Sequence, residues 1–108
     1  MLVRKKPIIV FCTTPDMECA GKIANFLVEK KLAACCNILP GLTSVYAWQG
    51  KIQRDNEHLL FIKSSKDLYE KLEAAILAQH PYDVPEIISV DISAGSKKYL
   101  DWISESIR

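Results

Sequence analysis

The sequence predicts an α+β fold in which an antiparallel sheet carries helices on one face. A continuous apolar run over 8–12 is typical of a strand inside a sheet. Alternation of apolar and polar residues over 88–93 is typical of a strand with one buried face. Two stretches with apolar residues at helical spacing separate the strand-like segments, and a short helix ends the chain. This order of elements is that of split β-α-β units.

The composition indicates an ordered protein, with 49% apolar and 25% charged residues among 108. We expect a single domain over 1–108, because this length suffices for one core. The net charge is +1, and acids and bases are mixed along the chain, so the sequence shows no basic surface of the kind that binds nucleic acid. The apolar run 8–12 is too short for a signal peptide or a membrane span, so we expect a cytoplasmic protein with no membrane partner.

The first half of the chain predicts a strand, a helix and a long hairpin. The strand covers Pro7–Thr13, and the helix starts with Thr14 as N-cap and Pro15 at its first position. The helical period extends to about Lys30 or Lys31. A long β-like stretch then runs to Trp48. Its interruption at Pro40-Gly41 indicates an edge position, a bulge or a break, and Gln49-Gly50 predicts a hairpin turn.

The second half predicts a return strand ending near Lys63, a helix, a strand and a terminal helix. Ser64 and Asp67 have the spacing of a capping box for the helix that ends near Gln79. Ile88, Val90 and Ile92 share one face of the last strand, and Leu100, Ile103 and Ile107 mark the short C-terminal helix. The whole predicts a ferredoxin-like βαββαβ plait with an extended hairpin. Its helices leave one sheet face uncovered, which favours self-association.

The segment His80–Glu86 joins the second helix to the last strand and holds an imidazole, a phenol and two carboxylates. Pro81 and Pro85 stiffen it by fixing φ and by pushing the preceding residues toward extended backbone. A plain connector needs none of these polar groups, so a binding function is one interpretation. The alternative is a turn in which Pro81 stops the helix and Glu86 faces water.

Several spaced motifs resemble the CutA divalent-cation tolerance proteins. The matching residues are, in order, Leu32-Ala33-Ala34-Cys35 with Asn37, Ser44-Val45-Tyr46-Ala47-Trp48, Glu57 with Lys63, His80-Pro81-Tyr82 with Val84-Pro85-Glu86, and Tyr99-Leu100 with Trp102. The resemblance implies a ferredoxin-like subunit in a homotrimer, similar in architecture to the PII signalling proteins. It also implies binding of divalent metal ions, copper above all.

The resemblance further implies a copper site made by Cys12 and His80. Gln79 stands where the family pattern has a further histidine, and an amide oxygen is a poorer copper ligand than imidazole or thiolate. We therefore expect weaker copper binding. The alternative for Cys12 is a structural role, as a small apolar side chain at the end of a buried strand. Cys35 and Cys36 read as buried reduced thiols, because the chain has no C-x-x-C pair.

A ligand cleft between subunits is the other site that we expect. Tyr46 and Trp48 alternate onto one strand face, where they either bury against a neighbour or line such a cleft. The other predicted cleft residues are Tyr82, Glu86, Glu57 and Lys63. Glu57 and Lys63 could instead form an exposed ion pair of roughly 0–1 kcal/mol. His58 reads as a solvated or interface residue.

Three functions compete. The leading hypothesis is a trimeric copper-binding protein of metal tolerance, and the second is a PII-type signalling module that holds a small ligand between subunits. No glycine-rich phosphate loop supports a nucleotide as that ligand. An enzyme such as an acylphosphatase is disfavoured, because the loop 13–16 holds no arginine to cradle a phosphate. We therefore predict a protein that is not an enzyme.

Overall fold

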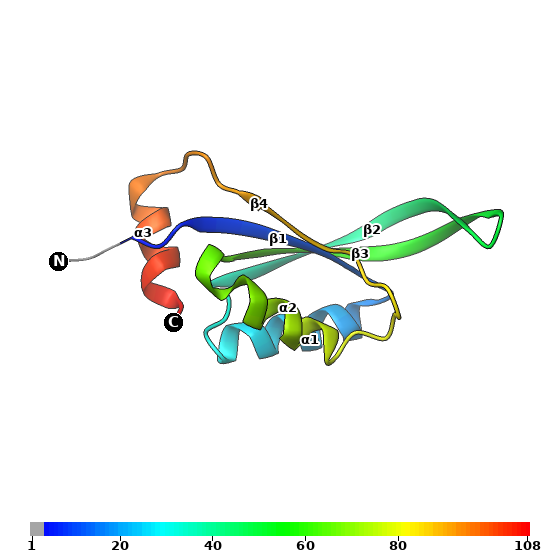
Figure 1. Ribbon diagram of the computed structural model, residues 1–108, viewed down its shortest axis with the longest axis horizontal. Helices are drawn as coiled ribbons and strands as arrows, with labels where there is room; N and C mark the ends of the chain where they lie inside the picture. The colour runs from blue at the N-terminus through cyan, green and yellow to red at the C-terminus, as the bar shows by residue number, and fades with distance from the viewer. Residues whose placement is uncertain (1–3) are drawn as a thin grey trace.

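A computed structural model describes residues 4–108 as a four-stranded antiparallel sheet with helices against one face (Figure 1). The strands are β1 (Pro7–Thr14), β2 (Cys35–Trp48), β3 (Lys51–Ser65) and β4 (Ile87–Asp91). Their order across the sheet is β2-β3-β1-β4. The helices are α1 (Met17–Glu29), α2 (Tyr69–Leu77), which follows the 3₁₀ turn η1 (Lys66–Leu68), and α3 (Lys97–Ser106). The predicted α+β plait is confirmed.

The core lies between the sheet and the pair of helices α1 and α2. On β1, Ile8, Val10 and Cys12 point to the helices and are at most 1% exposed. Alternate residues of a strand face opposite sides, so the continuous apolar run of β1 serves both faces of the sheet. A second, smaller apolar cluster holds α3 against the end of the sheet through Leu100, Ile103 and neighbours.

Helix α1 begins later than the sequence predicted. Its N-cap is Asp16, whose side chain accepts a hydrogen bond of 2.8 Å from the Cys19 amide. Thr14 instead ends β1, where its hydroxyl donates to the His58 carbonyl at 3.3 Å. The helix ends at Glu29, and Lys31 has a left-handed φ of 58°. A threonine and an aspartate both suit an N-cap, and the length of β1 decides between them.

The predicted capping box of Ser64 and Asp67 is also wrong. The Ser64 hydroxyl is buried and donates to the Leu32 carbonyl at 2.6 Å, while Ser65 precedes η1 and bonds to Asp67. Neither Ser65 nor the residue before α2 makes a side-chain cap bond to the backbone. The spacing is right for a cap, but the packing of β3 against the α1–β2 connection uses the Ser64 hydroxyl elsewhere.

A bulge in β2 decides which side chains the hairpin presents to each face. Leu39 pairs with Leu59, but Leu42 pairs with Glu57, so β2 contains one residue more than β3 over this interval. Gly41 supplies a left-handed φ of 81° there. One extra residue exchanges the two faces of a strand, and Tyr46 therefore shares a face with Glu57. The predicted interruption at Pro40-Gly41 is this bulge.

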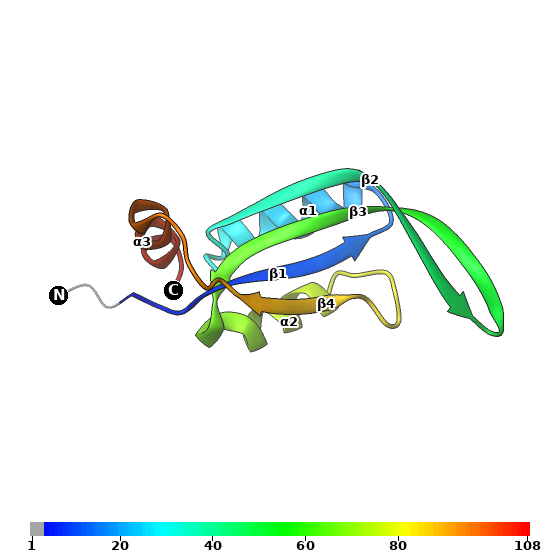
Figure 2. The same ribbon diagram turned by 90° about the horizontal axis from the view of Figure 1, so that it is seen from above.

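The hairpin turns at Gln49-Gly50, as predicted, with both residues at positive φ. It extends well beyond the helices, so that the molecule is 54 Å long and 25 × 22 Å across (Figures 1 and 2).

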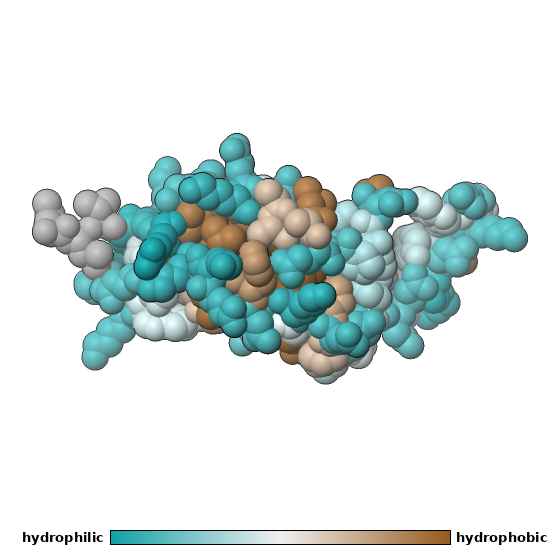
Figure 3. Space-filling view, turned by 90° about the horizontal axis from the view of Figure 1, so that it is seen from below, coloured by the Kyte–Doolittle hydropathy of each residue, from teal (hydrophilic) through white to brown (hydrophobic). Residues whose placement is uncertain are grey.

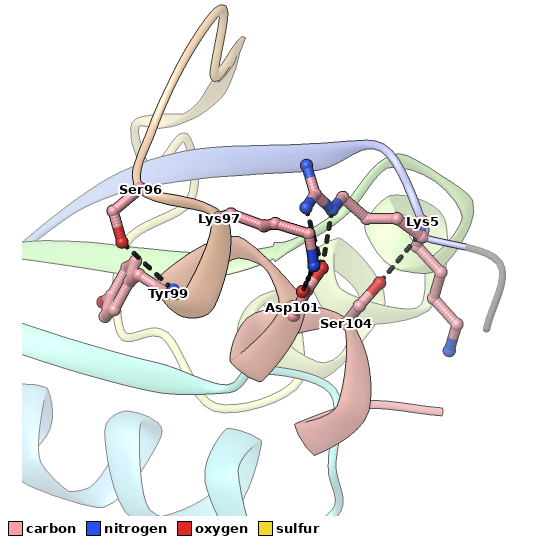
Figure 4. A network of polar contacts seen from close by, with 7 residues as sticks. Lys5, Ser96, Lys97, Tyr99, Asp101 and Ser104 are labelled. Atoms are coloured by element: carbon pink, nitrogen blue, oxygen red, sulfur yellow. Dashed lines mark hydrogen bonds and ion pairs between the residues drawn. The ribbon is translucent and has the colours of Figure 1, made fainter.

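Polar contacts hold helix α3 to the chain segment just before β1 (Figure 4). Ser104 accepts a hydrogen bond of 2.7 Å from the Lys5 amide, and Asp101 accepts from Arg4 at 2.7 Å and from Lys97 at 2.8 Å. The bonds to Lys97 and Arg4 lower the pKa of Asp101. The chain segment before the sheet and the last helix thus fold onto each other.

The sheet face away from α1 and α2 is open in the chain (Figure 2). Ile88 and Val90 of β4 are 53% and 47% exposed there, next to a half-buried ring pair of Phe11 and Phe61 at 5.4 Å. The sequence predicted a buried face for β4, but both residues lie on the side that no helix covers. The opposite, helical face shows apolar residues interspersed among hydrophilic ones (Figure 3).

Candidate functional site: an acidic aromatic pocket

A pocket of about 350 Å³ lies where the hairpin meets the loop between α2 and β4. Four of its residues come from the hairpin, four from the loop and one from the end of β1. They are Tyr46, Trp48, Asp55, Glu57, Tyr82, Asp83, Val84, Glu86 and Thr13. The bulge makes this grouping possible, because it turns the aromatic residues of β2 to the face that carries Glu57.

Two tyrosine–carboxylate pairs organise the pocket. The Tyr82 hydroxyl donates to Glu57 Oε2 at 2.9 Å, and the Tyr46 hydroxyl donates to Asp55 Oδ2. Burial raises the pKa of Tyr82, and the bond to Glu57 raises it further. For Tyr46, which is exposed, the bond to Asp55 is the main cause of the raised pKa. Both phenols therefore stay protonated and act as donors.

His80 fixes the loop that carries Tyr82. Its Nε2 lies 2.7 Å from the Thr13 carbonyl oxygen, and its Nδ1 accepts a hydrogen bond of 3.2 Å from the Tyr82 amide. A carbonyl only accepts and an amide N–H only donates, so this pattern requires the neutral imidazole with its proton on Nε2. The His80 and Tyr82 rings also pack at 4.7 Å. His80 thereby joins β1 to a loop 67 residues later.

Five of the six predicted cleft residues line the pocket, and Lys63 does not. Lys63 lies on the same strand face as Glu57, but six residues along β3, or about 20 Å away. Its ammonium donates to Asn37 on β2. This distance along β3 also excludes the alternative of an exposed ion pair between Glu57 and Lys63. Asp83 and Val84 lie in the predicted binding segment but were not among the predicted cleft residues. Thr13 and Asp55 were not predicted, although Asp55 follows the hairpin turn at strand spacing from Glu57.

The comparisons with known proteins place the chain in a family. The family model described as CutA1 divalent ion tolerance protein matches residues 8–106. The chain belongs to the CutA1 family. It is 50% identical over 101 residues to the chloroplastic protein CutA of Arabidopsis thaliana, which covers 94% of this chain and 56% of the relative. It is 48% identical over 98 residues to the divalent-cation tolerance protein CutA of Thermus thermophilus, covering 91% and 95%.

Solved structures of CutA1 proteins share the fold. The crystal structure of CutA1 from Oryza sativa superposes with a TM-score of 0.95 at 44% identity, covering 97% of this chain and 96% of the rice chain. The chain spans little more than half of the Arabidopsis relative and nearly all of the Thermus relative. Among residues 4–108, no helix is long and apolar enough to cross a membrane.

The copper ligands that the CutA resemblance implies do not form a ready metal site. Cys12 is fully buried in the apolar core, and burial raises the pKa of its thiol to about 12. Both ring nitrogens of His80 are occupied, and the Gln79 amide folds back onto the Ala75 carbonyl at 3.2 Å. Within residues 4–108, no group of three His, Cys, Asp or Glu side chains could hold a metal ion. These residues therefore do not fit a bound copper ion in this conformation.

Proposed function

We propose that this CutA1 protein serves divalent-cation tolerance as a homotrimeric ligand-binding protein, and that the acidic aromatic pocket is its binding site. The observation that carries the proposal is the convergence of five predicted cleft residues, from two distant parts of the chain, on one pocket. An aromatic wall with a few placed polar groups is the usual composition of a small-molecule site. In this proposal the protein binds its ligand without catalysing a reaction, and it acts in the cytoplasm.

Three large aromatic side chains support the proposal by their exposure. Trp48 is 55%, Tyr46 41% and Tyr82 36% exposed, all in the same pocket. Removing apolar surface from water is favourable by roughly 25 cal/mol per Å², and these exposed rings do not gain that free energy in the isolated chain. A ligand or a second chain that covers these rings would recover it.

Ligand screening by thermal shift tests the proposal, because a ligand selective for the folded state raises the melting temperature. The screen compares wild type with Trp48→Ala, against panels of metal salts, organic cations, organic anions and neutral metabolites. We expect at least one compound to stabilise wild type and to lose most of its effect in Trp48→Ala. Compounds that stabilise both proteins equally would contradict the pocket as the site.

Copper at Cys12 and His80 is a second candidate that needs another conformation, and the proximity of the two side chains favours it. The Cys12 thiol lies 3.7 Å and His80 Nε2 lies 2.7 Å from the same atom, the Thr13 carbonyl oxygen. Binding would require Cys12 to lose its proton and His80 to give up one hydrogen bond. Anaerobic competition for copper(I) against a chromophoric chelator should then show weaker binding in Cys12→Ala and His80→Ala than in Cys19→Ala. Equal affinities in all of these proteins would exclude this site.

A further inference from the structure

We infer that the acidic aromatic pocket selects an organic cation, a quaternary or protonated amine. The inference rests on the proposed function, since it names the ligand class of the same pocket. It follows from three properties of the described residues: the sign of the charge in the pocket, the aromatic side chains that line it, and the lack of a ligand set that converges on a bare metal ion.

The charge of the pocket is one-sided. Asp55, Glu57, Asp83 and Glu86 supply four carboxylates, and none of the nine lining residues is basic. Glu57 is only 7% exposed; its Oε2 accepts the Tyr82 hydroxyl, while its Oε1 stays accessible to solvent. A mostly buried carboxylate is stabilised when a positive charge approaches the oxygen that stays open to solvent. A ligand with positive charge meets this need, and an anion would be repelled.

The aromatic residues match the same charge. The hydroxyls of Tyr46 and Tyr82 are already committed to Asp55 and Glu57, so the ring faces are what these residues offer to a ligand. Trp48 is the most exposed of the three aromatic side chains. The face of an aromatic ring attracts cations, indole most strongly. Sites lined by aromatic rings recognise quaternary ammonium groups, and the carboxylates of this pocket add charge of the complementary sign.

A bare divalent ion fits the pocket less well. Calcium takes six to eight oxygen ligands and magnesium requires near-octahedral geometry, so both need several converging ligands. No three carboxylates among residues 4–108 converge in this way, and two of the four already accept tyrosine hydroxyls. The volume of about 350 Å³ suits a small organic molecule instead.

Titration calorimetry with choline and with its neutral isostere 3,3-dimethylbutan-1-ol tests the inference. The buffer is phosphate, so that no amine buffer competes, and added sodium chloride keeps the ionic strength constant. We expect choline to bind wild type at least about 10-fold more tightly than the neutral isostere, since only choline gains the cation–π and carboxylate attraction.

Three variants and one control assign the effect to the pocket. Trp48→Ala and Glu57→Gln should each weaken choline binding by about 5- to 30-fold, through loss of the indole face and of the buried charge. Asp83→Asn removes a pocket charge from an exposed side chain and should weaken binding about 2- to 5-fold without unfolding the protein. Glu105→Gln, the same charge change at an exposed position of α3, should leave choline binding unchanged.

Two outcomes would overturn the inference. One is equal binding of choline and the neutral isostere, or no choline binding by wild type. The other is a native mass that changes in Trp48→Ala while choline affinity does not, because the aromatic residues would then contact another chain. If an anion or a neutral compound loses its thermal shift in Trp48→Ala, the pocket remains the binding site and only its cation selectivity fails.

Discussion

At the scale of the residue, two thiols make stability depend on alkaline pH: Cys12, which is buried, and Cys36, which was predicted to be buried but is half-buried. Burial raises the pKa of Cys12 and of Cys36 to about 12 from 9.0. Above pH 9 the unfolded chain loses these protons while the folded chain keeps them, so stability falls as pH rises toward 12. At pH 10 we expect each thiol to lower the free energy of unfolding by about 1.4 kcal/mol relative to pH 8.

Urea unfolding at pH 8 and pH 10 measures this effect. Cys12→Ala should lose less stability between the two pH values than wild type does, because one thiol no longer titrates. Val10→Ala is the matched control, since Val10 lies in the same core with 0% exposure and has no titrating group. It should be less stable at both pH values and keep the wild-type difference. An unchanged difference in Cys12→Ala would mean that its thiol ionises as readily in the folded protein.

Functional and structural residues could be identified from the sequence more reliably than the contacts that these residues make. His80 stood out because Pro81 follows it at the end of a helix, but its bond to the Thr13 carbonyl joins residues far apart in the chain. No local pattern encodes such a contact. Ser64 illustrates the opposite failure, since a correct local spacing for a cap was overridden by its bond to the Leu32 carbonyl.

At the scale of the element, the bulge of β2 connects the sequence to the pocket. Gly41 has a φ of 81°, and a Cβ built there would meet nothing within 4 Å. The cost of Gly41→Ala is therefore a backbone cost of about 1–2 kcal/mol, without a clash. Gly21 in α1 also has open space around it, but at an ordinary helical φ. Gly21→Ala should instead stabilise the protein by about 0.5–1 kcal/mol.

Thermal and urea unfolding of the two variants compares identical side-chain changes in opposite backbone settings. Equal effects would show that the left-handed conformation of Gly41 is not maintained in solution. The sequence predicted a bulge, an edge position or a break at Pro40-Gly41, and could not choose among them. The choice depends on the pairing with β3, because only the register tells whether Tyr46 faces Glu57 or the opposite side.

At the scale of the whole molecule, the open sheet face is where we expect subunits to meet. Ile88 and Val90 are about half exposed beside Phe11 and Phe61, and the helices cover only the other face. Burying such a face between copies would recover its hydrophobic free energy, whereas a charge placed there would be desolvated without a partner. We therefore expect Val90→Lys to shift the proposed trimer to smaller species.

Native mass spectrometry and light scattering at several concentrations check this expectation. Leu77→Lys is the matched control, because Leu77 is 50% exposed on α2, on the helical face. It introduces the same charge at similar exposure and should leave the native mass unchanged. If Val90→Lys keeps the mass of wild type, the open face does not form the contact between subunits. If both variants dissociate, charge alone weakens the assembly, and the hairpin that extends beyond the helices becomes the next element to test.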